Sequence, residues 1–126
     1  MDSGGALTEE RIMDFEETLT HHLDLHHFVS VYAEKPDGSL KADDVRADDK
    51  CALGQWLRAA GADQQGVPEY ATLKEAHARV HQVGADIVGQ ADAGTLNRTV
   101  LSEKGEHKMA LVQFLSALMA IKSVMA

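Results

Sequence analysis

Apolar and polar residues alternate along this chain with a helical period almost throughout. In three long segments, apolar residues and histidines recur three and four positions apart, which is the spacing of one helix face. These segments run from about residue 8 to Glu34, from Pro68 to Ala93, and from Thr95 to Met125. No stretch of useful length alternates in the manner of a half-buried strand. The pattern therefore predicts three long amphipathic helices.

The same spacing predicts which residues face the core. The expected core-facing positions are Ile12, Phe15, Leu19, His22, His26 and Val29; Tyr70, Leu73, His77, Val80, His81, Gly84 and Ile87 or Val88; and Val100, His107, Leu111, Phe114, Leu118, Ile121 and Met125. Thr8 and Thr95 are the expected N-caps, and Pro68 suits the first position of a helix. Gly94 suits the end of the second long helix.

The segment between the first two long helices is mostly polar. Residues 35–50 begin with strong turn chemistry and are nearly charge-balanced, so we expect a long loop, a length that usually signals function or disorder. Residues 51–60 are expected to form a short helix that Asp48 or Asp49 caps and Gly61 ends. A second loop, 62–67, leads into the next long helix.

Three long helices and one short helix predict an all-α fold, an antiparallel four-helix-type bundle. We expect one domain over residues 1–126, with residues 1–7 as a frayed lead-in. The hydrophobic fraction of 44% and charged fraction of 25% are those of an ordinary soluble globular protein. An aromatic content of only 5% also favours helices over strands.

The net charge and the single cysteine limit which classes of function and which cellular compartment we expect. A net charge of −8 disfavours nucleic-acid binding and adsorption to an anionic membrane, since both need clustered Lys and Arg. The apolar stretches are far shorter than the roughly 20 residues of a membrane span, and the N-terminus lacks the features of a secretion signal. A single cysteine cannot form an internal disulfide, so we expect a cytoplasmic protein.

Seven histidines are the most unusual feature of the composition. His77 and His81 are four residues apart, which places two imidazoles on one helix face within reach of a single metal ion. This spacing alone is a weak signal, because two polar residues along a helix seam would show it too. His22 lies on the apolar face of the first helix, and buried imidazoles need partners for their nitrogens. A shared metal would satisfy all three better than three separate hydrogen-bonded core histidines.

Cys51 adds a fourth donor, although a free cysteine is often only a small buried hydrophobe. It stands at the expected start of a helix, where the helix dipole should lower the thiol pKa and favour the thiolate that binds metal. One Cys and three His suit tetrahedral Zn²⁺, and they leave no position open for water. We therefore expect a zinc site without enzymatic activity.

These residues carry a resemblance to a known family. Cys51-Ala52-Leu53-Gly54-Gln55-Trp56-Leu57, followed by Pro68, Leu73 and His77-x-x-x-His81, resembles the chemoreceptor zinc-binding (CZB) domain over about residues 12–125. The resemblance implies His22, Cys51, His77 and His81 as zinc ligands, and it implies Gly54 and Trp56 as packing positions of the short helix. The family usually has H-x-x-W in its first helix, whereas this chain has His22-Leu23-Asp24-Leu25. His21 and His26 therefore stay as alternatives to His22.

The resemblance also implies a role in signal transduction. CZB domains are bacterial regulatory modules attached to chemotaxis receptors and diguanylate cyclases, where they sense zinc or oxidants. Because we see no room for an output domain in 126 residues, we expect a separate signalling partner of chemoreceptor or diguanylate cyclase type.

Other readings of the same residues stay open. His107 is a candidate further or alternative ligand, or a core histidine, and Asp24 could orient an imidazole or simply be exposed. A zinc-stapled dimerisation domain is an alternative function, since the apolar positions Met119, Ile121, Val124 and Met125 could cover a second copy in a homodimer. A hemerythrin-like iron bundle is less favoured, because its core faces would carry carboxylates among the histidines.

Overall fold

The computed structural model describes residues 15–48, 51–58, 68–102 and 104–125. Its elements are α2 (Phe15–Glu34), α3 (Ala42–Arg46), α4 (Ala52–Arg58), α5 (Pro68–Ala93), the 3₁₀ helix η2 (Arg98–Leu101) and α6 (Glu106–Met125). All regular structure within these ranges is helical, so the all-α prediction is confirmed. The predicted lead-in 1–7, the Thr8 cap, Ile12, the Gly61 stop and the loop 62–67 lie outside the described residues.

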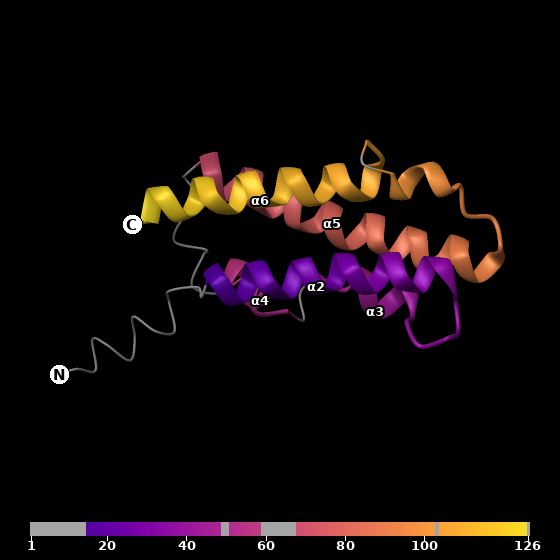
Figure 1. The fold of residues 1–126 in the computed structure, drawn as a ribbon. Helices are drawn as coiled ribbons and strands as arrows, with labels where there is room; N and C mark the ends of the chain where they lie inside the picture. The colour runs from indigo at the N-terminus through magenta and orange to yellow at the C-terminus, as the bar shows by residue number, and fades with distance from the viewer. Residues whose placement is uncertain (1–14, 49–50, 59–67, 103, 126) are drawn as a thin grey trace.

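The three long helices lie side by side and form the body of the bundle (Figure 1). α5 packs against both α2 and α6, and α2 also packs against α6. α2 and α5 run in the same direction, and α6 runs in the opposite direction (Figure 1). The short helices α3 and α4 lie on the return path between α2 and α5, where a regular bundle has its second long helix. No helix of the described ranges is both long enough and apolar enough to cross a membrane.

The core lies between α2, α5 and α6, as the apolar spacing predicted. Side chains without any exposed surface come from all three helices: Val29, Leu73, Ala85, Val88, Phe114 and Ile121. Each fully buried aliphatic or aromatic side chain stabilises the fold by about 1.5–3 kcal/mol. The predicted core-facing residues of α5 are all buried, including His77 and His81. Two histidines thus lie inside an otherwise apolar seam.

The prediction of a structureless loop over residues 35–50 is wrong at its centre, where α3 forms. Val45 of α3 is 5% exposed and packs against α5. At Gly84 of α5, an added Cβ would lie only 3.1 Å from Cγ1 of Val45, so glycine permits this close approach. The five-residue helix depends on tertiary packing, because so short a helix is not stable alone. A polar composition does not reveal such a contact.

The last helix begins later than predicted, and Thr95 is not its N-cap. Gly94 ends α5 as expected, at a φ of 73°, and the Thr95 backbone N–H donates to the Gln90 carbonyl at 2.9 Å. The side chain of Asn97 then caps η2 by accepting from the Thr99 backbone N–H. α6 starts after Gly105, whose carbonyl accepts from the Met109 N–H. Thr95 therefore closes the preceding helix and does not open the next one.

Candidate metal centre

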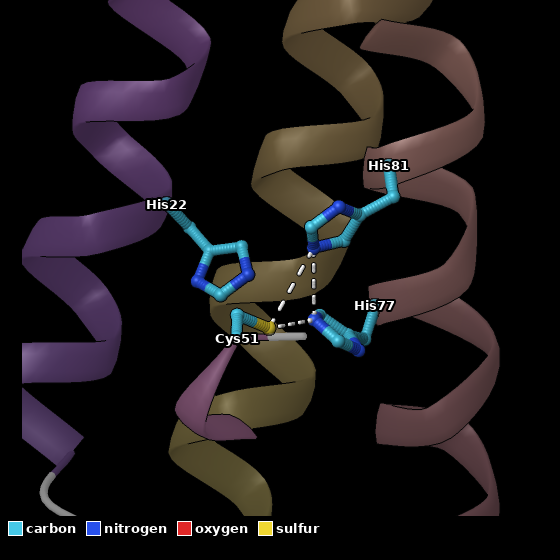
Figure 2. A group of neighbouring side chains, drawn as sticks. All are labelled: His22, Cys51, His77 and His81. Atoms are coloured by element: carbon cyan, nitrogen blue, oxygen red, sulfur yellow. Dashed lines mark hydrogen bonds between the residues drawn. The ribbon is translucent and has the colours of Figure 1, made fainter. Parts of the chain in front are cut away.

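Four of the predicted site residues come together inside the bundle. His22 projects from α2, His77 and His81 project from α5, and Cys51 lies directly before α4 (Figure 2). Their candidate donor atoms all lie within 4.8 Å of one another. The three histidines are buried and Cys51 is half-buried. Three separate segments of the chain thus place three imidazoles and one thiol around a common point.

The distances between these donor atoms match those around a single ion. Nε2 of His77 lies 3.0 Å from Nε2 of His81, and Sγ of Cys51 lies 3.2 Å and 3.8 Å from these two nitrogens. Tetrahedral zinc, with bonds of about 2.0 Å to nitrogen and 2.3 Å to sulfur, holds its nitrogens about 3.3 Å apart and nitrogen and sulfur about 3.5 Å apart. These three distances differ from that geometry by a few tenths of an ångström, and the donor atom of His22 lies within 4.8 Å of the other three.

Backbone carbonyls orient two of the imidazoles. Nδ1 of His22 lies 2.8 Å from the Thr18 carbonyl oxygen, and Nδ1 of His81 lies 2.8 Å from that of Val45. Because a carbonyl only accepts, each Nδ1 carries the hydrogen and each Nε2 keeps a lone pair. Metal-binding histidines usually donate their second ring N–H to a carbonyl or carboxylate in this way. The unpredicted helix α3 therefore contributes to the site through the carbonyl of Val45.

A nitrogen of His22 without a hydrogen-bond partner is compatible with a cation in the group, and Nε2 of His26 outside the group shares this feature. Nε2 of His22 is buried and has no hydrogen-bond partner, although the His22 ring centroid lies 5.0 Å from that of His77 and 5.4 Å from that of His81. A buried acceptor without a partner costs about 1–3 kcal/mol. A metal ion held by the group would give this nitrogen a partner, so the residues present fit a bound metal.

Cys51 itself occupies the N-cap position of α4. Its carbonyl accepts from the Gln55 N–H at 3.0 Å, and its Sγ accepts from the Gly54 N–H at 3.4 Å. Sulfur thus takes the place that an Asp or Ser oxygen usually holds at a helix start. The expected Asp48 cap is wrong, and Asp49 lies outside the described residues.

Burial sets the protonation of the group. It raises the pKa of the Cys51 thiol and outweighs the backbone N–H groups of Gly54 and Leu53, which lower it. The predicted net lowering at the helix start is therefore wrong, although a bound divalent cation would favour the thiolate. Burial also lowers the pKa of His22 to about 4 and that of His77 to about 2, and it lowers the pKa of His81. Neutral imidazole is the form that binds metal.

The alternatives to His22 lie elsewhere. His21 is exposed, with its ring centroid 5.0 Å from that of His22 but outside the convergent group. His26 instead stacks on His107 of α6, with centroids 3.8 Å apart and an interplanar angle of 21°. His107 is buried, and its Nδ1 lies 3.4 Å from the hydroxyl of Ser30. His107 is thus a seam histidine between α2 and α6.

Asp24 is exposed, and the orienting role considered for it belongs to backbone carbonyls at His22 and His81. Sequence reasoning missed these carbonyls, because backbone acceptors leave no trace in residue types.

The packing positions of the short helix are buried. Gly54 lies beside the sulfur, and Trp56 is 6% exposed in the apolar core together with Leu57. The hydroxyl of Tyr70 donates to the Leu57 carbonyl at 2.6 Å and joins the end of α4 to the start of α5. Beyond the metal group, α4 therefore contacts the rest of the bundle through its buried side chains and through this hydrogen bond.

Comparison with known proteins gives one match. The model of the chemoreceptor zinc-binding domain family matches residues 25–88, slightly more than half of the chain. This span contains Cys51, His77 and His81, and His22 lies three residues before it. Neither the curated proteins nor the solved structures contain a match to the chain.

Proposed function

The chain belongs to the chemoreceptor zinc-binding domain family, and from this premise we propose that it is a zinc-dependent sensory or regulatory module. One observation carries the proposal: three imidazoles from α2 and α5 and the thiol directly before α4 converge within 4.8 Å. This nitrogen and sulfur donor set suits tetrahedral zinc better than other common divalent metals. The ligands in this proposal are His22, Cys51, His77 and His81.

Zinc would join the start of α4 to the packed pair of helices α2 and α5. A bound ion would supply a positive charge that favours the deprotonated sulfur of Cys51. The carbonyls of Thr18 and Val45 hold two imidazoles in the metal-binding tautomer. Because four protein donors fill a tetrahedral site, no position remains for a reacting water, and we propose that the module is not an enzyme.

The Cys51 ligand is the point at which a signal would act. It is the only one of the four that is not buried, and it stands directly before the short helix α4. A hydroperoxide would oxidise the thiolate sulfur to sulfenic acid and be reduced to water or an alcohol. Loss of that ligand, or of the ion, would loosen α4 from the bundle, and a partner protein of chemoreceptor or diguanylate cyclase type would read the change.

Amide hydrogen exchange of residues 51–58 tests this role. The zinc-loaded protein should protect α4, whereas protein treated with a chelator or with hydrogen peroxide should exchange faster there and keep protection in α5 and α6. Unchanged exchange after peroxide, with the thiol still free, would restrict the signal to zinc itself. Unchanged exchange after full zinc removal would contradict the sensory role.

A zinc-stapled dimerisation domain is the second candidate, favoured by one surface feature. Met109, Val112 and Met119 of α6 are exposed by 45%, 42% and 57%. Ile121, which we expected in the core and considered for this surface, is fully buried in the core, and the side chains of Val124 and Met125 lie outside the described residues. Sedimentation of zinc-loaded protein over a range of concentrations measures the dimer. A dimer whose zinc never exchanges favours the staple over the sensor.

The described group contains no carboxylate ligand of the kind that the iron-bundle alternative requires. The convergent side chains are three His and one Cys, whereas oxygen-binding di-iron bundles place Glu or Asp among the ligands. Elemental analysis of purified protein separates the two, because iron in place of zinc would revive this alternative.

A further inference from the structure

A cavity of about 680 Å³ lies beside the metal centre. Thr18, His22 and Leu53, all buried, form its inner wall. Its outer residues are exposed and come mainly from the first half of α2: Glu16, Glu17, Thr20, His21 and Asp24, together with Ala52 of α4. The cavity therefore leads from solvent to the edge of the group.

The cavity reaches only one side of the metal centre. His22 and Cys51 are among its described lining residues, whereas His77 and His81 are not. His22 is 1% exposed, and its Nε2 is buried without a hydrogen-bond partner among the described residues. An ion that arrives through this cavity thus meets the unpartnered nitrogen of His22 and the half-buried sulfur of Cys51 first. It meets His77 and His81 of α5, the α5 pair, only afterwards.

The outer residues give the cavity a negative mouth. We call Glu16, Glu17 and Asp24 the acidic rim; all three are exposed, and no Lys or Arg is among the described lining residues. A cleft lined by one sign of charge raises the local concentration of oppositely charged ions and speeds their association. Anionic ligands would be repelled by the same rim.

We propose that this cavity is the path by which a divalent cation enters and leaves the metal centre, drawn in by the acidic rim. His21 stands at the mouth with its ring centroid 5.0 Å from that of His22, and it serves as a first imidazole ligand for the incoming ion. His22 and Cys51 then bind the ion before the α5 pair completes the site. This path rests on the proposed function, since it presupposes that the group binds a cation.

Association kinetics with cobalt(II) test the path, because a thiolate–cobalt complex absorbs light and reports arrival at Cys51 itself. In the variant Glu16→Gln/Glu17→Gln/Asp24→Asn, the association rate at low ionic strength should fall about three- to tenfold. The dissociation rate constant and the final stoichiometry should stay close to those of the wild type. Raising the salt concentration to about 0.15 M, where the Debye length is about 8 Å, should reduce the difference in association rate between the wild type and this variant.

A matched control separates the rim from overall charge. Asp44→Asn/Glu75→Gln/Asp86→Asn removes the same charge from exposed positions that do not line the cavity. This control should associate at nearly the wild-type rate. Thr20→Lys, which places a cation at the mouth without removing any carboxylate of the first helical turn, should slow association, and His21→Ala should slow it less.

The outcomes distinguish this path from the proposed function. Equal association rates in the rim variant, the control and Thr20→Lys, with one cobalt bound per chain, would overturn the path and leave the zinc site intact. Equal slowing of the rim variant and the control would also overturn it, because only net charge would then matter. If the wild type binds no cobalt at all, the proposed function falls together with the path.

Discussion

Two groups of histidines lie one helical turn apart along α2, and they are built differently. His22 belongs to the metal centre, where donor nitrogens and a sulfur point to a common centre and backbone carbonyls fix the tautomers. His26 belongs to the pair with His107, whose rings stack with their planes 21° apart. Burial lowers the pKa of both His22 and His26, so the two share residue type, helix and electrostatics.

The difference lies in the direction of the lone pairs, because donor atoms that converge can share a metal ion and histidines that are merely close together cannot. Nitrogen lone pairs lie in the plane of the imidazole ring, so two stacked rings direct them along nearly parallel planes. The His26–His107 pair therefore suits packing between α2 and α6. In the metal centre, the rings of His77 and His81 meet at 82°, and their Nε2 atoms come within 3.0 Å. The predictions below test whether the two groups differ as this geometry requires.

The largest expected effect is that of zinc on stability. At free zinc about a thousandfold above the dissociation constant, binding should raise the free energy of unfolding by about 4 kcal/mol. Urea unfolding of wild type with zinc and with a chelator measures this difference, and the fluorescence of Trp56 reports on α4. Cys51→Ala should show almost no dependence on zinc. Equal zinc stabilisation of that variant would place the ion elsewhere.

Parallel substitutions on α2 compare the two groups directly. His22→Gln should weaken zinc binding at least about a hundredfold, beyond the usual cost of disturbing an outer partner of a ligand. His26→Gln, one turn away, should leave the affinity within about threefold. Competition with a zinc-chelating dye measures both constants. The reverse order would show that His26 is the first-helix ligand.

The sequence predicted the helices that carry most of these histidines, but it did not predict which of them would meet in one group. The spacing of apolar residues predicted α2 and α5, and the spacing of His77 and His81 predicted one shared face. His22 and His26, however, lie on the same apolar stripe. What separates them is the residue each faces: the α5 pair and Cys51 on one side, His107 on the other. Such long-range neighbours are not encoded in local periodicity.

Two local features were not predicted from the sequence, for related reasons. α3 depends on the contact of Val45 with Gly84, which are far apart in the sequence. The raised pKa of the Cys51 thiol results from burial, whereas the position at a helix start argued for the opposite direction. Tertiary packing decides both features. Local sequence signals therefore predicted a lowered pKa for the Cys51 thiol, which is raised, and they did not indicate the helix α3.

The stacked pair should affect the pH dependence of stability. Burial and the neighbouring His26 lower the pKa of His107 to about 4, below its ordinary 6.5. Between pH 6.5 and 4 the unfolded chain binds a proton at this residue and the folded chain does not, so stability falls as the pH falls through this window.

His107→Gln should remove about 1–3 kcal/mol of that loss between pH 7 and pH 4.5. Urea unfolding of wild type and variant, both with chelator, measures how the free energy of unfolding of each protein changes with pH. The difference between the two free energies at pH 7 serves as the reference. Parallel pH profiles would show that His107 titrates normally in the fold.

A smaller effect is expected where α3 meets α5. Gly84→Ala places a methyl group 3.1 Å from Cγ1 of Val45 and should displace the carbonyl that orients His81. Zinc affinity should fall severalfold, up to about tenfold. Adding Val45→Ala removes the clash and should restore most of the affinity. No rescue in the double variant would mean that α3 does not position His81.

The central claim is that one zinc ion binds at the convergent group and none at the stacked pair. Elemental analysis of purified wild type, Cys51→Ala and His107→Gln tests it most directly. The account predicts about one zinc per chain in the wild type and in His107→Gln, and a sharp loss in Cys51→Ala. No zinc in the wild type, or the same zinc content in all three proteins, would contradict it.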